Sequence, residues 1–293
     1  MTWIVFSTSR KSKMHAWLQQ MLDHNLVPYV ATTEQYLPHL NLSILGENVS
    51  IKLLERAEDR VFHRAYLLAN SLAFGSPSLK MPNWVYIDCV LMQSAVIGFM
   101  LPRDLAPSAL LDFFRAEEGI EFDKLDFIPV SGQIAGLAID GQTLVGFSLF
   151  SLRRYFQPAK MPELAFSTKY AALSAYKADQ RNQFLGISQY NNPALRIHSL
   201  FGEKMYIAQP TMPLHPLGHM SFVYKMHIRL DEPSISARQK IKEPGHYDFL
   251  LRADDEVQKQ NIQERMAKGE KFIINPPVHI TKEQALYLPI SAE

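Results

Sequence analysis

The chain has 293 residues, of which 47% are hydrophobic and 20% charged, so its composition is that of a globular protein rather than a disordered, fibrous or disulfide-rich one. Its 30 Lys and Arg residues against 29 Asp and Glu give a net charge of +1, which argues against a protein that binds nucleic acid mainly through phosphate contacts. A single cysteine, Cys89, cannot form an intramolecular disulfide, and the apolar run at the start is too short for a signal peptide. No apolar stretch is long enough for a membrane span, so we expect a cytoplasmic protein.

The patterns before residue 45 are weak. Residues 2–6 have the composition of a short strand, and residues 11–24 carry apolar side chains at helical spacing. We expect residues 1–46 to form an N-terminal extension.

The pattern sharpens from residue 49. Residues 49–54 alternate as a strand does, and residues 57–74 carry apolar side chains on one helical face. Residues 84–88 and 95–101 are β-branched and aromatic runs, which predict two adjacent strands joined by a short turn. A short helix is predicted over residues 106–115.

A hairpin is predicted around Asp140-Gly141. Apolar runs at residues 134–139 and 144–152 flank this dipeptide, and glycine tolerates the positive φ that a tight turn needs.

Downstream of the hairpin the chain predicts, in order, a helix, a strand, a helix capped by Asn191 or Asn192, and two more strands. These segments are residues 163–177, 183–188, 191–202, 204–208 and 221–228. The last part of the chain is charged and contains one amphipathic helix near residues 254–268.

This order of elements indicates an α/β fold in which a mixed central sheet is flanked by helices. We expect that core to span residues 47–228. Residues 229–293 are then an appendage packed on it.

One segment carries a family resemblance. Residues 189–202, Gln-Tyr-Asn-Asn-Pro-Ala-Leu-Arg-Ile-His-Ser-Leu-Phe-Gly, resemble the second conserved segment of the GNAT superfamily of N-acetyltransferases. In that family a short strand leads to Asn-x-x-Ala, then to a residue on the same helix that is usually tyrosine, then to glycine. The matching positions are Asn191, Ala194, His198 and Gly202, with histidine in place of tyrosine.

Other segments are similar to the same family. Residues 49–59 look like its first strand and helix, Val96-Ile-Gly-Phe and Val145-Gly-Phe like its strand hairpin, and Phe222-Val-Tyr-Lys-Met like its last strand. The resemblance therefore spans about residues 47–228 and implies a GNAT-like fold.

The resemblance implies transfer of an acyl group from an acyl-CoA or acyl-carrier thioester to a small-molecule or peptide amine by direct attack. In the family a base takes the ammonium proton, main-chain amides polarise the carbonyl, and the tyrosine protonates the thiolate. His198 is the candidate for that last role because histidine can donate a proton near neutral pH. Glu163 is the candidate base, and Tyr190 the candidate residue lining the cleft.

The donor is expected in a V-shaped gap between the strands that end near Leu152 and Ser188. Candidate donor contacts are two arginines before the helix at 163–177, the first turns of that helix, and the asparagine of the second segment. These are Arg153, Arg154, Ala165, Ser167, Thr168, Lys169 and Asn191. The helix N-terminus offers free N–H groups and a favourable dipole to the pyrophosphate.

Two alternatives remain. Where the family has a glycine-rich loop for the pyrophosphate, this chain has Pro162, Ala165 and Ser167. A non-catalytic GNAT-fold binding or regulatory module without that loop is therefore a second interpretation, and an unrelated α/β enzyme a third.

The candidate residues also have ordinary structural interpretations. His198 is then a helix residue, Asn191 an N-cap, and Glu163 an acidic residue favoured by the helix dipole. His215 and His219 have a metal-ligand spacing, but a proline and a glycine between them disfavour a helix, and no metal site is expected.

Overall fold

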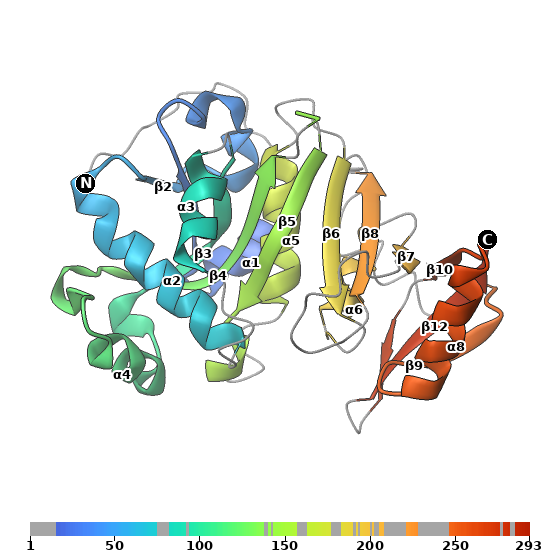
Figure 1. Cartoon of the computed structure of the whole chain (residues 1–293). Helices are drawn as coiled ribbons and strands as arrows, with labels where there is room; N and C mark the ends of the chain where they lie inside the picture. The colour runs from blue at the N-terminus through green and yellow to red at the C-terminus, as the bar shows by residue number, and fades with distance from the viewer. Residues whose placement is uncertain are drawn as a thin grey trace. The chain divides into compact units, whose positions relative to one another are not determined.

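A computed structural model gives the structure of the protein (Figure 1). It describes residues 16–74, 82–91, 94–137, 140–141, 143–156, 163–176, 183–189, 192, 194–199, 201, 205–207, 221–227, 246–275, 278–281 and 285–293. The chain divides into two compact units, Met1–Gln142 with Gly146–Arg181 and Thr143–Val145 with Asn182–Glu293.

The first unit is built on a mixed sheet with the strand order β5-β4-β3-β1-β2. Strand β1 runs parallel to β2 and antiparallel to β3, and β3 runs antiparallel to β4. The strands are β1 (Val27–Thr32), β2 (Ser50–Leu53), β3 (Val96–Pro102), β4 (Phe127–Leu137) and β5 (Thr143–Ser151), the last belonging to this unit from Gly146 onward. Strand β2 therefore lies at the edge of the sheet.

Helices cover both faces of this sheet. Figure 1 shows α2 (Arg60–Phe74) and α3 (Asn83–Leu91) in front of the strands and α5 (Leu164–Tyr176) behind them, and both layers contact β4. Helix α1 (Ala16–Asp23) and the 3-10 turn at Leu42–Leu45 cover the outer side of α5. The predicted mixed sheet flanked by helices is therefore confirmed.

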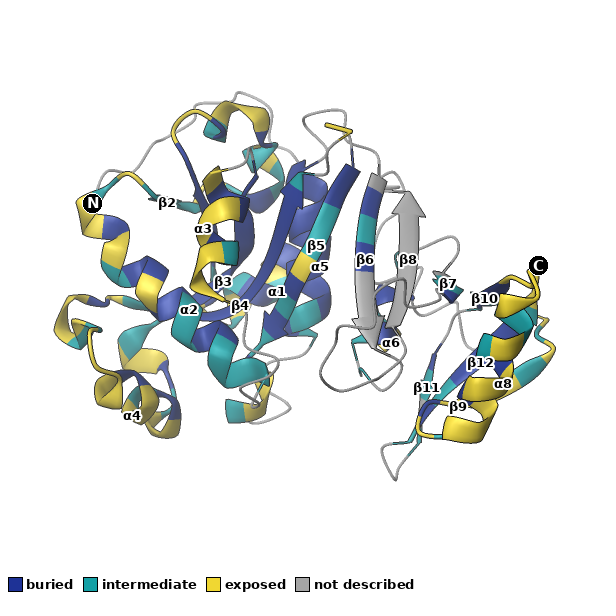
Figure 2. Ribbon diagram, viewed as in Figure 1, coloured by how far each residue is buried: buried dark blue, intermediate teal, exposed yellow. Residues whose placement is uncertain are grey.

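Helix α5 is buried along almost its whole length (Figure 2). Its few polar residues do not gather on one face, so it lacks the polar face of a surface helix, which is typical of a helix enclosed by protein. The remaining short elements of the unit are α4 (Ser108–Ala116) and the 3-10 turns Leu37–His39, Ala57–Asp59, Arg103–Leu105, Phe122–Lys124 and Arg153–Tyr155.

The core between α2 and the sheet requires two glycines. The hydroxyl of Tyr29 donates to the carbonyl of Ser131 at 2.8 Å, and it passes between Gly98 and Gly132. A Cβ at Gly98 would lie 2.1 Å from the same Ser131 oxygen, and one at Gly132 would lie 2.7 Å from the Tyr66 ring. Glycine is therefore dictated here by the aromatic packing.

The second unit contains an antiparallel sheet with the order β11-β12-β10-β7-β8-β6, in which β9 also pairs with β12. Its strands are β6 (Gln183–Gln189), β7 (Met205–Ile207), β8 (Ser221–His227), β9 (Phe249–Arg252), β10 (Phe272–Ile274), β11 (His279–Ile280) and β12 (Leu286–Ala292). Its helices are α6 (Leu195–His198) and α8 (Glu256–Ala267), the latter capped by the Asp255 carboxylate.

The predicted strand at residues 84–88 is wrong, because these residues form part of helix α3. The side chains that α3 buries recur at helical spacing, namely Tyr86, Cys89 and Val90. Packing of this face against β4 outweighs the strand propensity of a β-branched and aromatic run.

The flanking segments take part in the two sheets. Residues 27–32, inside the expected N-terminal extension, form β1, which lies between β2 and β3. Residues 272–274, inside the expected appendage, form β10, which pairs with β7. The strand expected at residues 2–6 lies outside the described residues. Within the described part of the chain, no helix combines the length and apolar character that a membrane crossing requires.

Candidate functional site

The candidate site residues that were predicted from the sequence lie in both units. Five of them, Glu163, Ala165, Ser167, Thr168 and Lys169, lie at the start of α5 in the first unit, and Arg153 and Arg154 form the 3-10 turn after β5. His198 ends α6 in the second unit. Tyr190 and Asn191 lie outside the described residues.

The start of α5 has an unusual backbone. Glu163 is one of two non-glycine residues with positive φ in the described chain, at 59°, and its carbonyl accepts the amide of Ser167 at 2.9 Å. That bond makes Glu163 the residue at which the helical hydrogen bonding begins. The amides of Leu164, Ala165 and Phe166 are then the first-turn groups that a helix leaves without an intrahelical acceptor.

The side chains of the second turn of α5 point into the protein. Ser167, Thr168 and Lys169 are completely buried. The Thr168 hydroxyl is 2.7 Å from the carbonyl of Leu164 and 2.7 Å from the hydroxyl of Ser131. Burial holds the pKa of Lys169 well below its ordinary value, because the charged ammonium is disfavoured away from water.

Arg153 and Arg154, the two arginines before α5, are exposed, whereas the second turn of α5 is buried. Arg154 donates to the carbonyl of Leu72, and its guanidinium lies 5.2 Å from the centre of the Tyr155 ring. Both arginines come just after β5, so they are charged groups near the end of that strand.

His198 is buried, and its amide donates to the carbonyl of Ala194 at 2.9 Å. The Asn192 side chain accepts a hydrogen bond from the Ala194 amide at 2.9 Å, but Ala194 is the N-cap of α6 and the helix has no side-chain cap, so the described helix lacks the predicted asparagine cap. The described helix spans Leu195–His198 and is shorter than the predicted 191–202.

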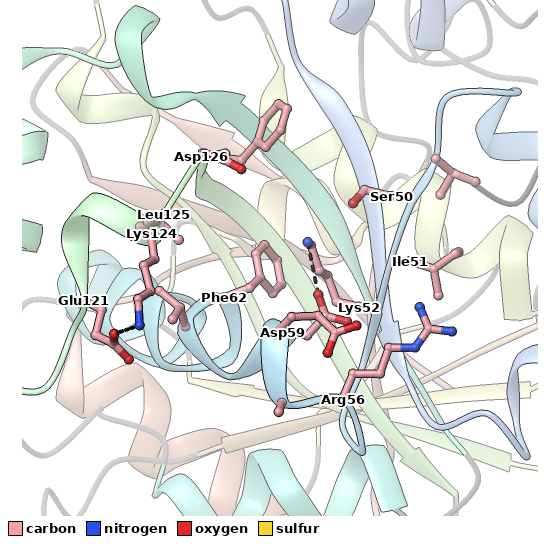
Figure 3. A pocket seen from close by; sticks show the side chains of 15 residues that line it. Ser50, Ile51, Lys52, Arg56, Asp59, Phe62, Glu121, Lys124, Leu125 and Asp126 are labelled. Atoms are coloured by element: carbon pink, nitrogen blue, oxygen red, sulfur yellow. Dashed lines mark ion pairs between the residues drawn. The ribbon is translucent and has the colours of Figure 1, made fainter. Parts of the chain in front are cut away.

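A cavity of about 450 Å³ in the first unit was not predicted from the sequence (Figure 3). It lies beside β2, the first turn of α2 and the segment that leads into β4. Its walls carry the charged residues Lys52, Arg56, Glu58, Asp59, Glu121, Lys124 and Asp126. Apolar contacts come chiefly from Val49, Ile51, Val61, Phe62, Leu125 and Phe127.

Asp59 and Lys52 form an ion pair at the cavity wall, with Oδ1 and Nζ 3.2 Å apart (Figure 3). The Lys52 ammonium also lies 5.4 Å from the centre of the Phe62 ring. The Asp59 side chain is 7% exposed and that of Lys52 17%, so water screens this pair less than a surface pair.

A chain of hydrogen bonds runs inward from Asp59. Its Oδ2 accepts the amide of Leu53 at 2.9 Å, and the carbonyl of Leu53 is 3.2 Å from Nε2 of His63. A carbonyl can only accept, so Nε2 carries the hydrogen, and Nδ1 accepts from the Tyr86 hydroxyl at 2.6 Å. Burial lowers the pKa of His63, which agrees with a neutral ring.

The sequence contained one signal for this network. Asp59 and His63 are four residues apart, so they lie on one face of a helix that begins near residue 60. Their common partner, the main chain of Leu53, carries no sequence signal.

The described residues contain no group of three or more His, Cys, Asp or Glu side chains placed to hold a metal ion. His215 and His219 are outside the described ranges. No protein-family model matches the chain, and no curated protein sequence matches it at a significant level.

Proposed function

We propose that the protein is an acyltransferase that moves an acyl group from an acyl-CoA or acyl-carrier thioester to an amine. The observation that carries the proposal is the element order. In the first unit, antiparallel strands β3 and β4 and their neighbour β5 precede α5 in the chain, and in the second unit β6 leads through α6 to β7 and β8. This is the order that the GNAT resemblance implies.

The donor contacts follow from the local geometry of each candidate. The first-turn amides of α5 and the exposed guanidinium groups of Arg153 and Arg154 are suited to phosphate oxygens, because both donate hydrogen bonds toward negative charge. The buried side chains of Thr168 and Lys169 support the helix from inside. Donor binding therefore rests on main-chain amides and the arginines.

In the proposed reaction the amine nitrogen attacks the thioester carbonyl, the C–N bond forms and the C–S bond breaks. The amine proton passes to a base, for which Glu163 is the candidate, and the leaving thiolate takes a proton from His198. A half-buried carboxyl and a buried imidazole are suitable groups for these two transfers.

The non-catalytic binding module is the second candidate function. The observation that favours it is the burial of Ser167 at a position where the family has a glycine. A side chain at this position fills space near the helix start, whereas glycine permits close approach of a phosphate. The module interpretation predicts ligand binding without acyl transfer.

The test is release of free thiol from acetyl-CoA and longer acyl-CoAs in the presence of a panel of small amines and lysine peptides. The acyltransferase proposal expects thiol release that depends on the amine and produces an equal amount of acylated product. Thiol release without acylated amine, or no release with any pair, contradicts it.

A His198→Phe variant tests the role of His198 as proton donor, with an amine substrate that the thiol-release assay identifies. Removal of a general acid lowers kcat by roughly 10²- to 10⁴-fold, whereas turnover that survives within a few-fold excludes this role. His246→Phe is the matched control, because His246 is an exposed histidine of the same unit. His198→Gln serves as a second variant that preserves polarity at the buried position.

A further inference from the structure

The cavity beside β2 follows the edge of that strand. Val49, Ser50, Ile51 and Lys52 are consecutive, and all of them line it. Successive side chains of a strand point to opposite faces, and Figure 3 shows Ile51 and Lys52 on opposite sides of the ribbon. A cavity that meets both faces runs along the outer edge of β2, where main-chain groups are accessible.

The direction of those groups follows from one hydrogen bond. The amide of Leu54 donates to the carbonyl of Thr32 in β1 at 3.0 Å. Along a strand, the main-chain N–H and C=O groups of successive residues point to opposite edges. The main-chain groups of Lys52 therefore point toward β1, as those of Leu54 do, and the main-chain groups of Leu53 and Ile51 point outward.

The outward groups of Leu53 are satisfied within the protein. The Asp59 carboxylate accepts its amide, and its carbonyl lies against Nε2 of His63 and accepts the amide of Arg56. Ile51 has no such partner among the described residues, although it lies only two positions away. Its N–H and C=O are therefore a donor and acceptor pair at the cavity, spaced as a neighbouring strand would use them.

The charges at the cavity are not balanced. Lys52 pairs with Asp59, Lys124 with Glu121, and Arg56 with Glu34 at 3.6 Å. These pairs account for the cations of the cavity wall.

Two carboxylates are left over. In the described part of the chain, neither Glu58 nor Asp126 has a cation within ion-pair distance, and both are exposed. The cavity therefore presents uncompensated negative charge next to the open main chain of Ile51.

We propose that this cavity binds a basic peptide segment in extended conformation. Its main chain pairs with Ile51, a lysine or arginine side chain is held by Glu58 and Asp126, and an apolar side chain contacts half-buried Val61 and Phe127. Strand addition at a sheet edge is a known mode of peptide recognition, in which main-chain bonds give affinity and side-chain pockets give specificity. The volume of about 450 Å³ limits the occupant to a few residues. The proposal does not depend on acyl transfer.

The experiment selects random linear peptides displayed on phage against the full-length protein. The most enriched peptide is then synthesised with a fluorophore, and its Kd is measured by fluorescence anisotropy. We expect enrichment of lysine or arginine alternating with apolar residues, and about three- to ten-fold weaker binding to the Glu58→Gln/Asp126→Asn variant. The Glu117→Gln/Glu118→Gln variant, with the same charge change at exposed positions of the same unit, should bind as the wild type does.

A separate variant tests the proposed pairing of the peptide with the main chain of Ile51. Ile51→Pro removes the outward N–H but no hydrogen bond to β1, since the amide of Ile51 faces away from that strand. We expect about three- to ten-fold weaker binding, and protection of residues 49–54 from hydrogen exchange when the peptide is added to wild-type protein. If Ile51→Pro does not fold, a peptide methylated on alternate main-chain nitrogens makes the same test.

Three results would overturn the proposal. They are enrichment of peptides without basic residues, equal affinity for both charge variants, and protection from hydrogen exchange confined to other segments. A concentration-dependent dimer that protects residues 49–54 without peptide would show that a second copy of the chain occupies the edge instead.

Discussion

The carboxylate of Asp59 holds the main chain of Leu53, with Oδ2 2.9 Å from the Leu53 nitrogen. The other oxygen of the same carboxylate lies 3.2 Å from Nζ of Lys52. One side chain therefore ties the edge strand β2 to the start of α2 through both the main chain and the neighbouring residue.

Asp59→Ala should lower the free energy of unfolding by about 2–3 kcal/mol, because it leaves a buried amide and a largely buried ammonium without their acceptor. Asp59→Asn keeps an oxygen for the Leu53 amide and should cost less. The measurement is urea unfolding followed by tryptophan fluorescence, because Trp84 lies on α3 in the first unit. Glu58→Gln, at the exposed neighbouring position, should change stability by less than about 0.5 kcal/mol.

His63 should make the stability of the first unit fall in mild acid. Burial lowers its pKa in the folded protein, while the unfolded chain titrates near about 6.5, so below that value the unfolded state binds the proton first. The contribution of neutral His63 to the free energy of unfolding is complete above about pH 6.5. It declines as the pH falls toward the pKa of His63 in the folded protein, by at most about 1.4 kcal/mol per pH unit.

The measurement is urea unfolding at about pH 7.5 and about pH 5.5. His63→Gln should lower stability at both values and flatten the decline between them. His24→Gln, in the same unit, should leave the decline unchanged. An unchanged decline in His63→Gln would show that other groups cause it.

Gly98→Ala should lower the free energy of unfolding by about 1–3 kcal/mol or more, because the new Cβ would overlap the Ser131 carbonyl and force β3 and β4 apart. Gly141→Ala is the comparison: its φ of +69° penalises a side chain, but no atom lies within 4 Å, so a loss of only about 1 kcal/mol is expected. Equal losses in the two variants would mean that the close approach at Gly98 relaxes.

Asn25 ends α1 in the left-handed conformation, with a φ of 60°. The Asn25 amide donates to the carbonyl of Leu22 and the Leu26 amide to that of Met21, the two bonds of a Schellman motif. Asn25→Ala should cost about 1 kcal/mol in urea unfolding, and Asn25→Gly should be neutral or stabilising. A destabilising glycine would show that the asparagine side chain itself matters.

The sequence predicted those elements whose local signals agree with their surroundings. The long helix α2 shows one apolar face, and the turn between β4 and β5 carries Asp140-Gly141 with Gly141 at positive φ. In such segments the periodicity and the turn residue both favour the observed structure.

Prediction from the sequence failed where tertiary packing determines the secondary structure. The first half of β4 contains Pro129 and Gly132, which are turn signals in isolation. In the sheet Pro129 sits where the register with β3 shifts, and Gly132 makes room for aromatic rings. Residues 84–88 have strand propensity, yet packing against β4 makes them helical.

The cavity beside β2 was also beyond prediction. It depends on segments far apart in the sequence, around residues 50, 59 and 125, and on the main chain of Ile51, whose outward direction follows from sheet register alone. The sequence can indicate that charged residues are frequent in these segments. Which of them form ion pairs, and that Glu58 and Asp126 form none among the described residues, depends on how the elements pack.

The most direct test of the acyltransferase proposal is isothermal titration of the full-length protein with acetyl-CoA and a series of longer acyl-CoAs. The account predicts saturable binding in the micromolar range for at least one donor, weakened when Arg153→Gln and Arg154→Gln are combined and unchanged by Arg60→Gln. An absence of binding across the whole series would contradict it.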